Sequence, residues 1–144
     1  MAQWNEVSSL EDLERFLDRV VSFHDGIVKE VHWVNRDHID ASLAMSPYRL
    51  ADARMLVQRQ GGDPSAVELY FERIWRCDLN TVDFIFESKA ATVTSVDSLG
   101  PTISLLRLDL ESTTLAFERM FWRETSDWMG SDVRFGPFTS PIRE

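Results

Sequence analysis

The chain has 144 residues, 44% hydrophobic and 27% charged, values typical of one globular domain spanning 1–144. Its formal net charge of −9 argues against nucleic acid and anionic membranes as partners, because both bind basic surfaces. No apolar run is long enough to cross a membrane, and the first residues lack the pattern of a secretory signal. The single cysteine, Cys77, excludes an intramolecular disulfide, so we expect a cytoplasmic location.

The first predicted element is an amphipathic helix. Ser8 and Glu11 have the spacing of a capping box, which predicts that the helix begins here. Apolar residues then recur every three or four positions, as on one face of a helix: Leu10, Leu13, Phe16, Leu17 and Val20. We expect the helix to end near Phe23, where Gly26 breaks the pattern, and its apolar face to pack against the sheet that follows.

Residues 27–45 alternate apolar and polar side chains, which predicts a β-hairpin. A three-residue loop at 35–37 would place Trp33 opposite Ile39 and direct the apolar residues of both arms to one face. With this register we expect Trp33 to be buried and the polar residues of both arms to share the other face.

Six further strands are expected, eight in all. They cover residues 54–60, 66–74, 81–87, 90–96, 102–110 and 114–122. The connections are too short for parallel crossovers, so the strands should form an antiparallel meander. The predicted fold class is therefore strand-dominated α+β. One N-terminal helix precedes a meander that forms either one strongly twisted sheet or a two-sheet sandwich.

The alternating pattern ends near Glu124, and residues 123–144 form an aromatic C-terminal tail. The tail contains Trp128, Phe135 and Phe138, which is too many aromatic residues for a disordered segment. We expect it to pack on the domain. The alternative is that its aromatic residues form a contact surface for a partner.

Two groups of polar residues are candidate sites. His24 and Asp25 could bind a ligand or act as a base, or they could simply shape the turn after the helix. The expected hairpin register places His32 opposite Asp40, with His38 diagonal to His32 on the same face. Two histidines and a carboxylate can bind a transition metal, and the alternative is a solvated polar face.

The sequence contains no catalytic motif that we can identify. The serines lack the pattern of a nucleophile elbow, and Cys77 has no histidine near it in sequence, so we expect a core thiol. These observations favour a protein that is not an enzyme and needs no cofactor.

One segment carries a family resemblance. Residues 22–28, Ser-Phe-His-Asp-Gly-Ile-Val, follow a helix and lead into a strand. Together with the strands at 67–71 and 110–117, this order resembles a group of small bacterial proteins of uncharacterised function. Some of these are associated with polymorphic-toxin loci and regarded as immunity proteins. The resemblance implies a helix followed by an antiparallel meander, and a toxin as the partner.

Small size, acidity and this resemblance predict a protein-binding module, namely an immunity-type inhibitor of a bacterial toxin. Its acidic surface would cover the basic, nucleic-acid-binding cleft of the toxin. Two other interpretations stay open. One is a metal-binding protein or metal-dependent enzyme that uses His32, His38 and Asp40. The other is a subunit that self-associates, for example as a homodimer, through an edge strand or the tail.

Overall fold

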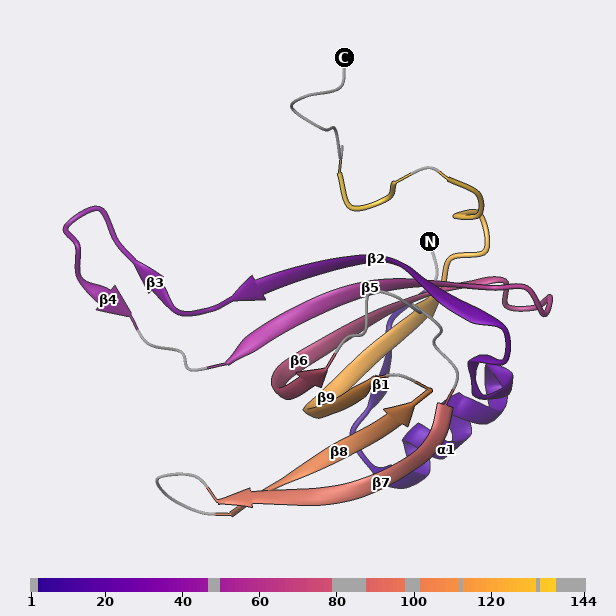
Figure 1. Ribbon diagram of the computed structural model, residues 1–144, viewed down its shortest axis with the longest axis horizontal. Helices are drawn as coiled ribbons and strands as arrows, with labels where there is room; N and C mark the ends of the chain where they lie inside the picture. Colours follow the sequence, from indigo (N-terminus) through magenta and orange to yellow (C-terminus); the bar gives the residue numbers. More distant parts are fainter. Residues whose placement is uncertain are drawn as a thin grey trace.

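The computed structural model describes residues 3–46, 50–78, 88–97, 102–111, 113–131 and 133–136. The strand-dominated α+β class is confirmed, because one helix near the N-terminus precedes an antiparallel sheet (Figure 1). In chain order the elements are β1 (Asn5–Val7), α1 (Leu10–Arg19), the turn η1 (Val21–Phe23), β2 (Gly26–Asn35), β3 (His38–Ile39), β4 (Met45–Ser46), β5 (Ala51–Arg59), β6 (Ala66–Asp78), β7 (Ser88–Asp97), β8 (Thr102–Leu110) and β9 (Thr114–Glu124).

Seven of the described strands form one antiparallel sheet, in the order β2-β5-β6-β9-β8-β7 with β1 paired to β9. The first half of β9 pairs with β8, and its second half pairs with β1. The pairing of β6 with β9 interrupts the meander, because β7 and β8 lie between these two strands in sequence. The strand expected at 81–87 lies outside the described residues. No helix in the described part of the chain is long and apolar enough to cross a membrane.

Helix α1 begins one residue later than the capping-box spacing predicts. Ser9 is the N-cap, and its Oγ accepts a hydrogen bond of 3.1 Å from the backbone N–H of Asp12. In return, the backbone N–H of Ser8 donates to the Asp12 carboxylate at 3.3 Å. The α-helix ends at Arg19, before the expected Phe23, and the chain continues into η1.

The turn η1 has left-handed backbone geometry at residues other than glycine. The φ angles of Val21, Ser22 and Phe23 are 52°, 50° and 57°. Such angles cost roughly 1–2 kcal/mol per residue, so they persist only where the fold compensates for them. The compensation here is Phe23, whose side chain is fully buried in the core and meets the ring of Phe16 at 5.5 Å.

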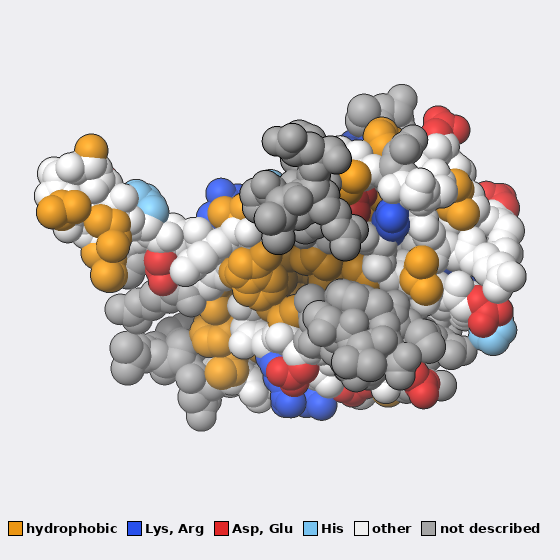
Figure 2. Space-filling view, turned by 45° about the horizontal axis from the view of Figure 1, so that its top comes forward, with side chains coloured by type: hydrophobic (Ala, Val, Ile, Leu, Met, Phe, Trp, Pro, Cys, Tyr) orange, Lys and Arg blue, Asp and Glu red, His pale blue; other side chains and the backbone are white. Residues whose placement is uncertain are grey.

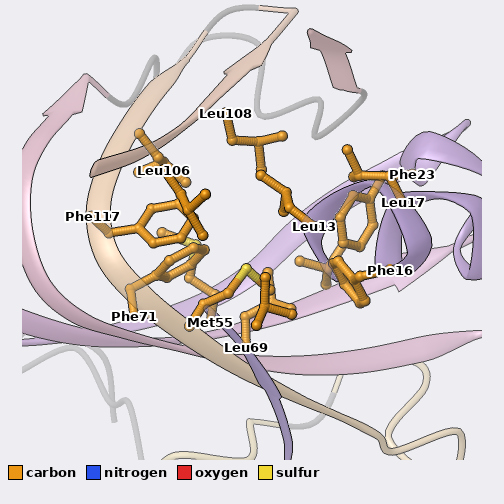
Figure 3. Close-up of a cluster of buried hydrophobic side chains, with 14 of the residues drawn as sticks. Leu13, Phe16, Leu17, Phe23, Met55, Leu69, Phe71, Leu106, Leu108 and Phe117 are labelled. Atoms are coloured by element: carbon orange, nitrogen blue, oxygen red, sulfur yellow. The ribbon is translucent and has the colours of Figure 1, made fainter. Parts of the chain in front are cut away.

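The core lies between α1 and one face of the curved sheet (Figure 3). The sheet curves so that β7 reaches the helix. Ten labelled side chains show how the helix faces the sheet: Leu13, Phe16, Leu17 and Phe23 on one side and Met55, Leu69, Phe71, Leu106, Leu108 and Phe117 on the other. The rings of Phe71 and Phe117 meet edge to face at 4.9 Å.

The prediction of a hairpin over residues 27–45 is wrong. Strand β2 pairs with β5, so that Trp33 lies opposite Ala53. Trp33 is 46% exposed, although it was expected to be buried, and Ile39, its expected partner, is 62% exposed. The physical reason is the length of the possible partner strand. Strand β2 has ten residues and β5 has nine, with a buried face, so the two form many cross-strand pairs. Residues 38–46 contain only two strands of two residues each.

Residues 38–46 instead form a hairpin of their own, which we call the arm. Among the described strands, β3 and β4 pair only with each other, His38 with Ser46 and Ile39 with Met45. The turn is closed by Asp40, whose Oδ1 accepts hydrogen bonds from the backbone N–H groups of Ser42 and Ala44. The arm projects from the body of the molecule beyond the end of β2 (Figure 1).

Candidate functional site

His24 and Asp25 lie together at the surface, where η1 leads into β2. The Nε2 of His24 and the Oδ2 of Asp25 are 3.4 Å apart, and both side chains are more than half exposed. Asp25 has a left-handed φ of 55°, and its carbonyl oxygen accepts a hydrogen bond from the N–H of Gln60. Asp25 therefore shapes the turn that connects the helix to the sheet.

The structure does not bring His32, His38 and Asp40 together as a metal-binding set. His32 lies on β2 opposite Arg54, whereas His38 is on the arm and its Nδ1 lies 3.4 Å from the carbonyl oxygen of Arg36. Hydrogen bonds from the Ser42 hydroxyl and the Ala44 backbone hold the pKa of Asp40 below its ordinary value. The hairpin register behind the predicted set is not formed. No cluster of three or more metal-ligating side chains occurs among the described residues.

The polar cluster that the structure does form lies on the outer face of the sheet, opposite the core. Its centre is Glu68, a carboxylate with no solvent exposure. Three guanidinium groups surround it. Arg134 lies at 2.8 Å and Arg123 at 3.2 Å, and Arg54 donates two hydrogen bonds to the Oε1 of Glu68. Burial alone would raise the pKa of Glu68, but the hydrogen bond and charge of Arg54, with the charges of Arg134 and Arg123, outweigh it and lower the pKa.

Residues 128–131 and 133–135 of the C-terminal segment cover this cluster. The side-chain amide of Gln58 donates to the carbonyl oxygens of Trp128 and Gly130, both at 3.1 Å. The carboxylate of Glu30 accepts hydrogen bonds from the backbone N–H groups of Arg134 at 2.8 Å and Phe135 at 3.0 Å. In Figure 1 this segment rises from β9 past β5 and β2, on the side of these strands away from α1.

The aromatic residues of this segment lie against the arginines. The guanidinium of Arg134 is 5.1 Å from the centre of the Trp128 ring, and that of Arg54 is 4.9 Å from the centre of the Phe135 ring. Both rings are partly buried, so one part of each ring packs against an arginine of the cluster and another part remains exposed at the surface. Phe138, the third aromatic residue predicted for a contact surface, lies outside the described residues.

Sequence reasoning missed the Glu68 cluster, although one signal for it is present. Alternation over 66–71 places Glu68 opposite the core, where a solvated residue is expected. The continuous apolar run Met55-Leu56-Val57 on the neighbouring strand, however, is typical of a strand buried on both faces. Leu56 is paired with Glu68 and is fully buried, so this face is covered.

The arm forms a second distinctive surface. Its apolar side chains point into solvent: Ile39, Leu43 and Met45 are 62%, 84% and 68% exposed. At its base Trp33 and Val34 of β2 are also exposed. Figure 2 shows hydrophobic side chains gathered on the projection at the left of the view. Exposed apolar groups gathered on one projecting element are typical of a contact surface for another molecule.

Cys77 on β6 is not suited to nucleophilic chemistry. It is partly buried against the core, and burial together with the charge of Asp78 raises the pKa of its thiol to about 11. The thiol is therefore almost fully protonated at neutral pH and behaves as a small apolar group.

Comparisons with known proteins find no relative. No family model matches the chain, and neither the curated proteins nor the solved structures contain a match.

Proposed function

We propose that this protein is a protein-binding module that acts as an immunity-type inhibitor of a bacterial toxin, with the arm as its contact element. The observation that supports this proposal is the exposure of Ile39, Leu43 and Met45 on a hairpin that projects from the domain. Burying such side chains against a partner contributes roughly 1.5–3 kcal/mol each. Three of them therefore suffice as the apolar centre of a contact surface with a polar rim.

The construction of the arm also fits a binding role. Two paired two-residue strands are too short to be stable alone, and the arm buries none of its large apolar side chains in the core. The Asp40 turn holds the shape of the arm. Because the arm buries no large apolar side chain in the core, it contributes little to the stability of the fold. A hairpin that the fold does not need is best explained by what it contacts.

Charge favours a basic partner. The chain has a net charge of −9, and the segment leading into and forming the arm carries Asp37 and Asp40. The nearby Arg36 turns back toward the sheet, where its guanidinium lies 3.0 Å from the carboxylate of Asp52. An acidic protein with an apolar arm complements a basic cleft of the kind that binds nucleic acid, and electrostatic attraction speeds their encounter. Binding would inhibit the toxin by occluding that cleft.

The test compares the wild type with an arm variant in which Ile39, Leu43 and Met45 are all replaced by serine. The matched control is Val93→Ser, because Val93 is 53% exposed on β7, away from the arm. Each tagged protein is used to capture partners from the source cell. We expect wild type and control to retain the same basic protein and the arm variant to lose it. Co-expression of that protein with each variant then measures toxicity, which only wild type and control should suppress.

Equal capture by the arm variant would refute the role of the arm, and the absence of any protein partner would refute the proposal as a whole. Sedimentation at several protein concentrations tests the remaining interpretation. A dimer that forms in the wild type but not in the arm variant would show that the arm binds a second copy of this chain.

A further inference from the structure

A cavity opens on the outer face beside the Glu68 cluster. Its volume is about 500 Å³, and the described residues that line it are Trp4, Arg54, Tyr70, Phe121 and Arg123. This volume lies within the range of about 300–1,000 Å³ that is usual for small-molecule pockets. Strand pairing makes the floor of the cavity, since Arg54 lies opposite Tyr70 and Tyr70 lies opposite Phe121 on adjacent strands.

Aromatic rings form the walls. Trp4, just before β1, meets Tyr70 edge to face at 6.4 Å, and Tyr70 meets Phe121 in the same way at 6.3 Å. The hydroxyl of Tyr70 is engaged away from the cavity, because it donates to Asp52 at 3.1 Å and accepts from Arg36 at 3.3 Å. The cavity is thus bounded by flat apolar surfaces, which favour a ligand that contains a planar ring.

Positive charge is concentrated at the same place. The guanidinium groups of Arg54, Arg123 and Arg134 gather around the carboxylate of Glu68, in a chain whose net charge is −9. Arg54 and Arg123 both line the cavity, and Glu68 holds them in place. The ring of Phe135 supports Arg54, and the guanidinium of Arg123 lies 4.2 Å from the centre of the Trp4 ring. Arginines positioned in this way recognise carboxylates and phosphates.

We propose that this cavity is a binding site for a small organic anion in which a carboxylate or phosphate is attached to a planar ring. Arg54 and Arg123 would bind the anionic group, and Trp4 and Phe121 would pack against the ring. The residues that carry this inference are not on the arm, so it does not depend on the proposed toxin partner. It adds a small-molecule site to a protein-binding module.

The test is isothermal titration calorimetry of the full chain with two ring anions, benzoate and adenosine 5′-monophosphate. The neutral counterparts are benzamide and adenosine. We expect at least one anion to bind at 1:1 with a Kd below roughly 1 mM, and its neutral counterpart to bind about tenfold more weakly or not at all. Binding of benzoate alone would identify a carboxylate ligand, and binding of the nucleotide alone a phosphate ligand.

Variants locate the site. Trp4→Ala and Arg54→Gln should each weaken binding about tenfold or more, because each removes one recognition element. The control Arg15→Gln removes an exposed arginine of α1 that pairs with Asp12 in the helix and does not line the cavity, so binding should be unchanged. If Arg54→Gln unfolds the protein, Trp4→Ala still tests the site, because Trp4 lies outside the Glu68 ion cluster.

Two results would overturn the inference. One is the absence of binding by both anions, and the other is binding that Trp4→Ala leaves unchanged. The arm variant separates this site from the proposed function, since it should bind the anion like the wild type even if it captures no partner.

Discussion

The substitution Glu68→Gln tests whether the outer-face cluster stabilises the fold. It removes the carboxylate that lies among Arg54, Arg123 and Arg134 while keeping the size of the side chain. The wild-type carboxylate accepts hydrogen bonds from Arg54 and Arg123 and forms an ion pair with Arg134. A glutamine amide offers one acceptor oxygen and directs its N–H groups at positively charged donors.

The expected loss follows from burial. Breaking a buried ion pair by removing one partner costs about 3–5 kcal/mol, because the charge left behind has no compensation. Here Arg54 is 37% exposed and can turn to water, whereas Arg123 and Arg134 are only 11% and 12% exposed. We therefore expect the free energy of unfolding to fall by about 3 kcal/mol, near the lower end of that range.

Urea unfolding at pH 7, followed by circular dichroism, measures this difference. The control is Glu118→Gln, because Glu118 pairs with the single arginine Arg73 and both side chains are about a quarter to a third exposed. Partly exposed pairs contribute about 0–1 kcal/mol, so the control should unfold nearly like the wild type. A loss of less than about 1 kcal/mol in Glu68→Gln, or an equal loss in both variants, would refute the reasoning.

The same cluster predicts a pH dependence. The folded-state pKa of Glu68 lies below its ordinary value of about 4.3, so its stabilising contribution is complete above that pH. The contribution is lost as the pH falls through the lower, folded-state pKa, because the native state must then bind a proton. Wild type and Glu68→Gln should therefore converge in stability in acid. A constant difference from pH 7 to pH 2 would contradict this assignment.

Three further predictions concern other parts of the fold. Leu17→Ala should lower the free energy of unfolding by about 2–5 kcal/mol in urea, because Leu17 is buried in the core. A loss below about half a kcal/mol would mean that the helix packs only loosely on the sheet. Val21→Gly should raise the melting temperature, since it relieves a left-handed φ of 52°. The same change at Val34, in β2, should lower it, and equal effects would count against backbone strain at Val21. Cys77 should react with iodoacetamide at pH 8 about 100-fold more slowly in the folded than in the unfolded protein, because its thiol pKa is about 11. Equal rates would show an ordinary thiol.

Local pattern was enough to predict most strands and the helix. The predicted strand at 102–110 agrees with β8, and the strands predicted at 66–74 and 114–122 lie within β6 and β9. These segments have one face in the core, so alternation in the sequence records burial directly. The helix was predictable for the same reason, because its apolar stripe packs on that core and Ser9 caps its first turn.

Strand pairing was not predictable from local pattern. Residues 27–35 and 38–46 carry compatible apolar sets, and a local hairpin between them requires little loop-closure entropy. Pairing with β5 prevails because it is longer and because Val31 then lies opposite Met55 in the core. The choice between these two partners of β2 depends on side chains from all the neighbouring strands, so the sequence of a local segment cannot predict it.

The candidate sites show the same division. The sequence by itself determined the acidity, the alternation that gives each strand a core face, and the outward position of Glu68. Only the tertiary structure decided that Glu68 is buried, because its partner Arg134 is held over it by a hydrogen bond from the Arg134 backbone N–H to Glu30, 104 residues earlier in the chain. Only the tertiary structure left the apolar side chains of the arm in solvent. Strand β2, their expected partner, pairs with β5 instead. Burial of a charge and exposure of an apolar group both depend on which distant segment covers a surface, and neighbouring residues in sequence do not specify that segment.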